Sequence, residues 1–295
     1  MDNRELEIFL TLADTLHFGR TSQICHISPS ALSRSIKQLE EKLDTTLFIR
    51  DNRSVLLTHE GKLFQEYARE SLQHWEIFRD TLQRESGELK GEISIYCSVT
   101  ASYSFLYQIL SQFRQAHPGI EIKLHTGDPA QATQRVLSGQ EDLAIAPRPP
   151  KPPSNLDFNR IAITPLVFIA PRPENQEPAL LQALENQSWR KVPMILSEEG
   201  LIRDRLDQWF RQKHIKPNIY AQVAGHEAIV SMVSLGFGVG VVPKIVIDNS
   251  PLANQVQQLP DHPKLEDYDV GLCALKKRLK SPLVRAFWEQ LKQGQ

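Results

Sequence analysis

The chain has 295 residues, of which 41% are hydrophobic and 23% charged, and its formal net charge is −1. This length exceeds one typical hydrophobic core and predicts two or three domains. The three cysteines, Cys25, Cys97 and Cys273, are odd in number and far apart, which argues against a disulfide framework or a zinc site. Because no apolar run nears the roughly 18 residues of a membrane span and the first residues do not resemble a signal peptide, a cytoplasmic location is expected.

Two short helices are predicted at the start of the chain. Apolar residues recur at i, i+3, i+4 and i+7 in Leu6, Phe9, Leu10 and Ala13, which predicts an amphipathic helix over residues 3–15. Residues 18–25 form a second helical stretch, and residues 26–27 form a turn after it. A third helix would complete a helix-turn-helix.

The third helix has a defined start and two different faces. Ser28 is a good N-cap, and Pro29 suits the first helical position. Such a helix fits the major groove, where hydroxyls and basic side chains meet phosphates and base edges, although a solvated face would have the same composition. The apolar stripe consists of Leu32, Ile36, Leu39 and Leu43, and the polar stripe of Ser30, Ser33, Arg34 and Lys37.

A hairpin with an arginine at its tip is predicted next. Residues 47–50 and 55–58 are strand-like, and the turn between them carries Arg53, which either enters a minor groove or meets phosphate, or is merely solvated. Acidic residues slightly outnumber basic ones over residues 1–60, so the contacts with DNA must be few and local. The residues expected to contact DNA are Arg20, Ser28, Ser30, Ser33, Arg34, Lys37, Arg50 and Arg53.

A long helix is predicted over residues 61–86. It carries a seam with alternating spacings of four and three, which is typical of a coiled coil and predicts a partner helix from a second protomer. The alternative is packing against its own domain. The seam consists of Phe64, Ala68, Ser71, Trp75, Phe78 and Leu82.

These N-terminal segments resemble the LysR-type transcriptional regulators. Thr21 and Ser22 depart from the family pattern, in which two alanines are usual, and Pro29 precedes the position at which the family more often has proline. The resemblance implies a double-stranded DNA operator, self-association into a dimer or tetramer, and contact with RNA polymerase. It is carried by Phe18, His26, Ser28, Ala31, Leu32, Ser33, Arg34, Ile36, Leu39, Glu40, Leu47, Phe48, Arg50, Leu57, Thr58 and Gly61.

Strands and helices alternate after a short hinge at residues 87–91, which predicts α/β lobes with parallel sheets. The first lobe has strands at 93–97, 120–124 and 143–146 and helices at 103–116 and 130–138. The second has strands at 166–169, 194–196 and 220–223 and helices at 201–214 and 226–235. The chain then returns through a strand at 270–274 and a closing helix at 282–291.

The predicted fold is therefore an α+β multidomain chain. A winged helix-turn-helix spans residues 1–60, a linker helix and hinge 61–90, one effector lobe 91–163 with 268–295, and the other 164–267. The two lobes resemble periplasmic binding proteins, in which the ligand lies in the cleft between lobes.

The turn at residues 98–102 is the main candidate for ligand binding. It lies between a strand and a helix, where hydroxyls and free N–H groups favour a small carboxylate, although its serine or threonine could simply cap the helix. His226 is either a ligand donor or only a helix-end residue, and Arg203 either neutralises the ligand or pairs with Glu199. The residues expected to contact the ligand are Ser98, Thr100, Ser102, Thr126, Asp128, Ser197, Arg203 and His226.

Other motifs argue against catalysis. The glycines at 236–240 lack the Lys-Ser/Thr pair of a phosphate loop, so we interpret them as a packing turn. No nucleophile or metal-ligand set is recognisable, and we expect neither an enzyme nor a metal site. Cys97 is either a redox sensor or a buried thiol, and the proline-rich loop at 147–153 is either a docking motif or a stiff connector.

Within the LysR family, the resemblance is to activators of branched-chain amino acid synthesis, notably through residues 17–20, 97–101 and 225–228. It implies activation of the ketol-acid reductoisomerase gene in response to its substrates, acetolactate and acetohydroxybutyrate. The alternatives are a regulator of another pathway, or a small-anion binding protein or enzyme with an added N-terminal module.

Overall fold

The computed structural model describes residues 1–295 except 51–53, 85–88, 261–262 and 294–295. It divides into two compact units, residues 1–86 with 138–140 and residues 87–137 with 141–295. Within the described part of the chain, no helix is long and apolar enough to span a membrane.

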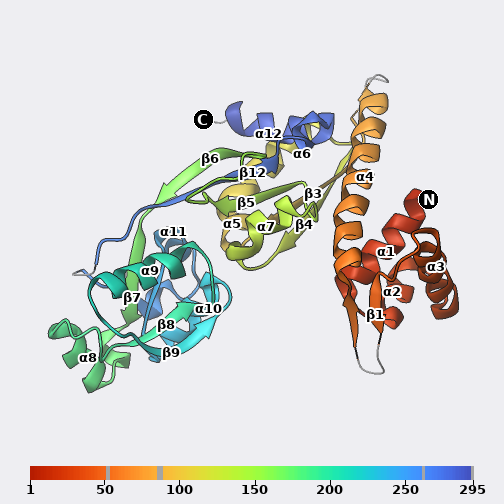
Figure 1. The fold of residues 1–295 in the computed structure, drawn as a ribbon. Helices are drawn as coiled ribbons and strands as arrows, with labels where there is room; N and C mark the ends of the chain where they lie inside the picture. The colour runs from red at the N-terminus through yellow and green to blue at the C-terminus, as the bar shows by residue number, and fades with distance from the viewer. Residues whose placement is uncertain (51–53, 85–88, 261–262, 294–295) are drawn as a thin grey trace. The chain divides into compact units, whose positions relative to one another are not determined.

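The N-terminal unit is a winged helix-turn-helix followed by a long helix (Figure 1). The first two helices begin and end where the sequence predicts, and the third begins where it predicts, because each has a local signal. Asp2 and Glu5 form a capping box, His26 ends the second helix in the left-handed conformation, and Ser28 caps the third. The elements are α1 (Asn3–Thr15), α2 (Phe18–Cys25), α3 (Pro29–Lys42), β1 (Phe48–Arg50), β2 (Val55–Leu57) and α4 (His59–Arg84).

Aromatic side chains form the centre of this unit. The ring of Phe9 lies 5.3 Å from that of Phe48 and 4.7 Å from that of Phe64, so α1 joins the hairpin to α4. Leu32, Ile36 and Leu39 of α3 are fully buried against this core. The predicted apolar stripe was one residue too long, because Leu43 is the C-cap of α3 and is exposed.

The second unit contains two five-stranded sheets, one in each lobe. The sheet of the first lobe has the order β4-β3-β5-β12-β6, and that of the second lobe β11-β7-β10-β8-β9. Their strands are β3 (Gly91–Cys97), β4 (Ile120–Thr126), β5 (Leu143–Pro147), β6 (Leu156–Thr164), β7 (Leu166–Pro171), β8 (Pro193–Ser197), β9 (Asn218–Val223), β10 (Val239–Pro243), β11 (Val256–Gln258) and β12 (Tyr268–Leu275).

Both sheets are mixed, and the prediction of parallel sheets was wrong in this respect. β3 is parallel to β4 and β5, but β12 is antiparallel to both of its neighbours. In the second sheet, β8 is parallel to β9 and β10, whereas β7 is antiparallel to β10 and β11. The antiparallel strands are those by which the chain passes from one lobe to the other and back, so they enter the sheets in the opposite direction.

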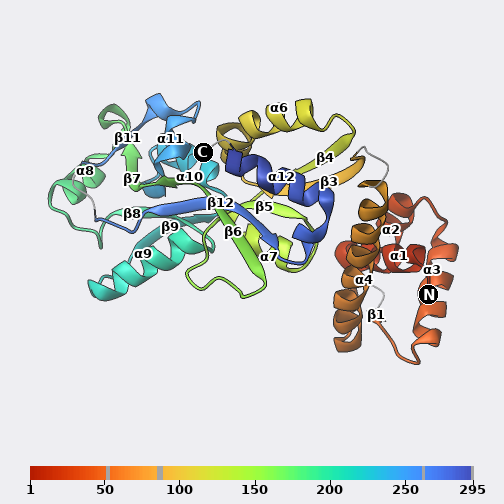
Figure 2. The same ribbon diagram turned by 90° about the horizontal axis from the view of Figure 1, so that it is seen from above.

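Helices cover both faces of each sheet (Figures 1 and 2). In the first lobe α6 and α12 lie side by side on one face, where the rings of Phe113 and Phe287 are 5.0 Å apart, and α7 covers the other face. In the second lobe α8 and α9 cover one face, and α10 and α11 cover the other. The helices are α5 (Val99–Ala101), α6 (Tyr107–Ala116), α7 (Ala132–Leu137), α8 (Pro178–Glu185), α9 (Leu201–Gln212), α10 (His226–Ser234), α11 (Lys244–Asp248) and α12 (Pro282–Gln293).

The first helical stretch of this unit starts earlier than predicted. Residues 99–101, which the sequence analysis assigned to a turn, are already helical and lead through a π-helical segment, Ser102–Leu106, into α6. The reason is that Ser98 is the N-cap, since its hydroxyl accepts a hydrogen bond from the amide of Ala101.

Five of the helices and strands given above were not predicted, namely β6, α8, β10, α11 and β11. The most instructive is β10, which follows the glycine-rich segment interpreted as a packing turn. Gly238 has φ of +149°, and a Cβ there would lie 2.3 Å from the carbonyl oxygen of Pro193, so close packing does require glycine. The valines after it form a strand buried on both faces, which lacks the alternation used to recognise strands.

Candidate functional site

The outer face of α3 presents polar side chains to solvent. Ser30, Ser33, Arg34 and Lys37 are exposed. Lys37 lies 3.5 Å from Glu41, a weak surface pair, while Arg34 makes no ion pair with any residue that the structure describes. Ser28 is less available, because its hydroxyl caps the helix and also lies 3.0 Å from that of Ser30. The exposed polar face of α3 is therefore centred on Arg34.

The other residues predicted to contact DNA, Arg20, Arg50 and Arg53, differ in exposure and in their hydrogen-bond partners. Arg50 donates to Glu40 at 3.0 Å, and its guanidinium lies over the ring of Phe18 at 4.9 Å. Glu40 in turn accepts hydrogen bonds from the amides of Leu47 and Phe48, so Arg50 belongs to a network that fixes the hairpin on α3. Arg20 is exposed on α2, and Arg53 lies outside the described residues.

The predicted seam on α4 divides into two parts. Phe64 and Ala68 are buried in the core of the N-terminal unit, which is the alternative that the sequence left open for the seam. Trp75, Phe78 and Leu82 are 50%, 54% and 53% exposed, and the rings of the first two lie 6.1 Å apart. Ser71 lies between the two parts and is half-buried. Only the second part remains available to a partner helix.

A small cavity of about 30 Å³, partly open to solvent, lies between the two lobes of the second unit. Both lobes contribute to its walls, which are mainly apolar. Of the predicted ligand contacts, Ser98, Thr100 and His226 line this cavity. The full lining is Ser98, Thr100, Ala101, Phe105, Pro129, Ile145, Ala146, Pro147, His226, Pro243, Ile245, Val246, Tyr268 and Val270.

Thr100 is hydrogen-bonded to a residue that was not among the predicted ligand contacts. Its amide donates to a carboxylate oxygen of Glu227 at 2.8 Å, and its hydroxyl donates to the same oxygen at 2.5 Å. Burial alone would raise the pKa of Glu227, but the bonds from Thr100, the residue's own amide and the neighbouring His226 outweigh it and hold the pKa below its ordinary value. Glu227 is therefore a carboxylate at neutral pH.

An imidazole and a phenol complete the polar part of the lining. His226 is buried, and burial lowers its pKa against the opposing charges of Glu227 and Asp128, so the ring is neutral at pH 7. Tyr268 is also buried, which raises the pKa of its phenol, and its ring packs edge-on against His226 at 5.9 Å. The Tyr268 hydroxyl makes no hydrogen bond to a described residue and is available to a ligand.

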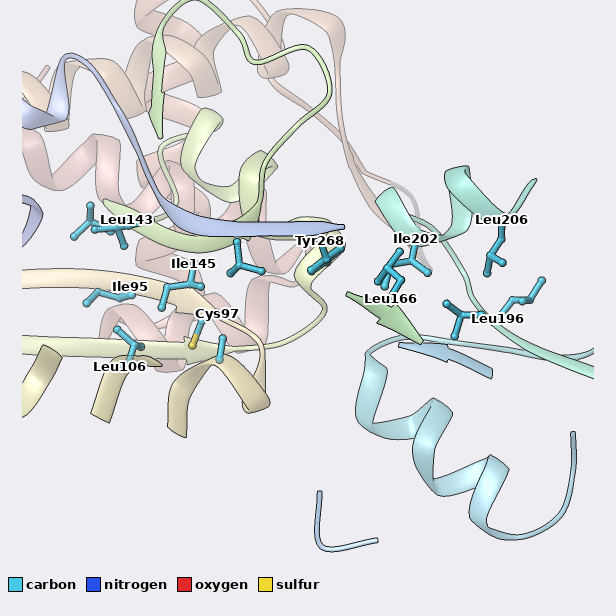
Figure 3. Close-up of a cluster of buried hydrophobic side chains, with 14 of the residues drawn as sticks. Ile95, Cys97, Leu106, Leu143, Ile145, Leu166, Leu196, Ile202, Leu206 and Tyr268 are labelled. Atoms are coloured by element: carbon cyan, nitrogen blue, oxygen red, sulfur yellow. The ribbon is translucent and has the colours of Figure 1, made fainter. Parts of the chain in front are cut away.

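Tyr268 was missed because it stands at the point where the chain returns to the first lobe, more than 160 residues after Thr100. Figure 3 shows it between the buried side chains of the two lobes, with Ile95 and Cys97 on one side and Leu166 and Leu196 on the other. Its position depends on the return of the chain to the first lobe, and no pattern in the neighbouring residues predicts it.

Five predicted ligand residues do not line the cavity. Ser102 donates to the carbonyl oxygen of Val99, and Thr126 is exposed at the end of β4. Asp128 accepts from the amide of Ala130 as the cap of the short helical turn at Pro129–Gln131. The remaining two are Ser197 and Arg203.

Ser197 is buried, and its carbonyl oxygen accepts from the guanidinium of Arg203. Arg203 also binds Asp207 at 3.0 Å and Gln222 at 2.6 Å. The predicted alternative partner, Glu199, was wrong, because Glu199 precedes the first residue of α9, whereas Asp207 lies one helical turn after Arg203.

Cys97 has the character of a buried thiol. It is fully buried in the core of the first lobe, and burial raises the pKa of its thiol to about 12. At neutral pH the reactive thiolate is therefore scarce. No group of three or more potential ligands among the described residues is arranged to hold a metal ion.

The comparisons with known proteins cover the whole chain. Residues 3–62 match the family model "Bacterial regulatory helix-turn-helix protein, lysR family", and residues 86–295 match the "LysR substrate binding domain". The chain is 47% identical to the transcriptional activator IlvY of Haemophilus influenzae over 99% of this chain and 100% of that one. It is 44% identical to the regulator IlvY of Escherichia coli over 99% of each.

Solved structures agree in fold. The LysR family regulator CbnR superposes with a TM-score of 0.65 at 20% identity over 99% of each chain. CbnR in complex with its target DNA gives a TM-score of 0.62 at 19% identity over 100% of each chain. With a winged helix-turn-helix, a two-lobed effector unit and matches to both family models, the chain belongs to the LysR family of DNA-binding transcriptional regulators.

Proposed function

We propose that the protein activates genes of branched-chain amino acid biosynthesis, in particular that of ketol-acid reductoisomerase, in response to acetolactate or acetohydroxybutyrate. The observation that carries this proposal is the 47% identity to the activator IlvY over nearly the full length of both chains. A regulator of another pathway is the alternative within the family.

The lining of the cavity supports an effector of this chemical class. Acetolactate and acetohydroxybutyrate are small branched acids with one hydroxyl, one keto group and one carboxylate. Apolar walls such as Ile145 and Val246 suit the alkyl groups, while the Tyr268 hydroxyl and the neutral His226 suit the hydroxyl and keto oxygens.

The exposed polar face of α3 supports sequence-specific reading of DNA. A recognition helix of this kind places its side chains against base edges in the major groove, and Arg34 is suited to a guanine. The exposed aromatic part of α4, Trp75, Phe78 and Leu82, suits a partner helix from a second protomer. A homo-oligomer would bind two half-sites and, as an activator, would contact RNA polymerase.

A gel-shift assay tests the DNA part of the proposal. We expect specific retardation of the fragment upstream of the ketol-acid reductoisomerase gene at moderate salt, against an excess of unrelated DNA. Failure to discriminate between the two DNAs would contradict regulation of this gene and would favour a regulator of another pathway.

Calorimetry tests the effector part. Acetolactate titrated into the full-length protein should release or absorb heat, and Tyr268→Phe should weaken binding roughly tenfold because it removes one hydroxyl. Tyr107→Phe is the matched control, since this tyrosine is 74% exposed and does not line the cavity. If both variants bind as the wild type does, Tyr268 is not a ligand contact.

A further inference from the structure

The groups best suited to bind a carboxylate in this cavity already hold one. Both donors of Thr100 converge on a single oxygen of Glu227, at 2.8 Å from the amide nitrogen and 2.5 Å from the hydroxyl oxygen. Thr100 is only 3% exposed, so water competes little for these bonds. Hydrogen bonds to an ionised acceptor are about twice as strong as neutral ones.

These hydrogen bonds join the two lobes. Thr100 follows β3 in the first lobe, whereas Glu227 lies in the first turn of α10 in the second lobe. The two residues are 127 positions apart in the sequence. Their contact therefore depends on how far the lobes are closed, and any ligand that separates them changes the relation between the lobes.

The described lining of the cavity offers an incoming carboxylate no positive charge. It contains no lysine or arginine, and its one imidazole is neutral because burial lowers the pKa of His226. A second carboxylate next to that of Glu227 would meet repulsion without compensation. An acidic effector and Glu227 should thus compete for the same two donors.

We propose that Glu227 is an internal ligand of the effector site, whose carboxylate bridges the lobes through Thr100 and must leave before the carboxylate of an effector binds there. The effector-free bridge is then one of two states, and the effector selects the other by its greater affinity for it. This inference rests on the proposed function in that it takes the effector to be a small carboxylic acid.

Hydrogen exchange of the effector-free, full-length protein tests the bridge itself. We expect the amide of Thr100 to exchange roughly tenfold faster in Glu227→Gln than in the wild type, because the charged acceptor is lost. Glu199→Gln is the matched control, since it removes one exposed carboxylate from the other strand-to-helix turn of the same lobe. Unchanged exchange in Glu227→Gln would overturn the bridge.

Calorimetry with acetolactate tests the competition. Glu227→Gln and Glu227→Ala should bind roughly tenfold more tightly than the wild type, and Glu199→Gln should bind as the wild type does. Unchanged or weaker binding by both Glu227 variants would overturn the competition. If no protein binds acetolactate while exchange at Thr100 is accelerated as expected, the assignment of the effector fails and the bridge stands.

Discussion

The polar face of α3 and the cavity between the lobes use polar side chains in opposite ways. On α3, the side chains of Ser30, Ser33 and Arg34 are exposed and can bind a charged partner such as DNA. In the cavity, Thr100 is buried and already satisfied by Glu227. On the functions proposed above, DNA binds to side chains of α3 that are already exposed, whereas an acidic effector must first break the contact between Thr100 and Glu227.

The two regions lie in separate compact units, so we expect that one can be unfolded without the other. Phe9→Ala should destabilise the N-terminal unit by about 3–5 kcal/mol, because it removes the ring that joins Phe48 and Phe64. Hydrogen exchange should show lost protection in α1–α3 and retained protection in β3 and β5. Ile24→Ala, at a 52% exposed apolar residue of the same unit, is the control. Equal loss in both units would mean that they unfold together.

The exposed part of α4 gives the next largest effect. Trp75→Ala should weaken the dimer by about 2–4 kcal/mol, because a large aromatic anchor is removed from a helix-to-helix contact in both protomers. Sedimentation equilibrium measures the change, with the exposed Lys62→Ala on the same helix as control. An unaltered dissociation constant would place the dimer contact elsewhere.

Substitution of the two basic residues on the exposed polar face of α3 should affect DNA binding in different ways. Arg34→Ala should cost about 1–3 kcal/mol on the operator and relax base specificity, whereas Lys37→Ala should weaken binding on all sequences and reduce the salt slope by about 1. Titrations of DNA at several salt concentrations distinguish the two. If Arg34→Ala lost the same affinity on every sequence, Arg34 would be a phosphate contact.

The smallest expected effect is the pH dependence of the cavity. Because the pKa of His226 is lowered in the native state, the unfolded chain takes up a proton there first, and stability falls as the pH drops below about 6.5. One such group accounts for at most about 1.4 kcal/mol per pH unit. Glu227, whose charge acts on this ring, remains ionised while His226 takes up its proton, since the pKa of this carboxyl is held below its ordinary value.

Denaturation between pH 7 and pH 5 checks this expectation. His226→Gln should lose part of the acid sensitivity that the wild type shows, whereas the exposed His59→Gln should retain all of it. An identical pH profile for His226→Gln would mean that this imidazole titrates normally.

Features fixed by interactions between residues close in the sequence could be predicted, whereas features fixed by contacts between distant segments could not. The three N-terminal helices have signals within a few residues of their ends, such as Ser28 and His26. The predicted bounds of the first two and the predicted start of the third were confirmed. The two-lobed architecture was also predictable. The direction of β12 was not, because strand direction depends on the path of the chain between the lobes. The strand β10 was missed because it directly follows the glycines interpreted as a turn and itself contains Gly240.

The same difference between local and long-range contacts explains which residues of the cavity were predicted. Ser98 and Thr100 were predicted because a turn at the end of a strand is a local pattern. Tyr268 and Glu227 lie near these residues only because the chain crosses between the lobes and returns. Arg203 does not line the cavity and instead pairs with Asp207, four residues later on the same helix. Local patterns thus identified Ser98, Thr100 and His226, and they missed Tyr268 and Glu227.

The central claim is that a small acid bound in the cavity changes how the protein holds DNA. It is tested most directly by the bend angle of an operator fragment bound to the full-length protein, measured with and without acetolactate at fixed salt. We predict a different angle when acetolactate is present and a larger response at low acetolactate concentration in Glu227→Gln. An angle that stays constant at saturating acetolactate would contradict the claim.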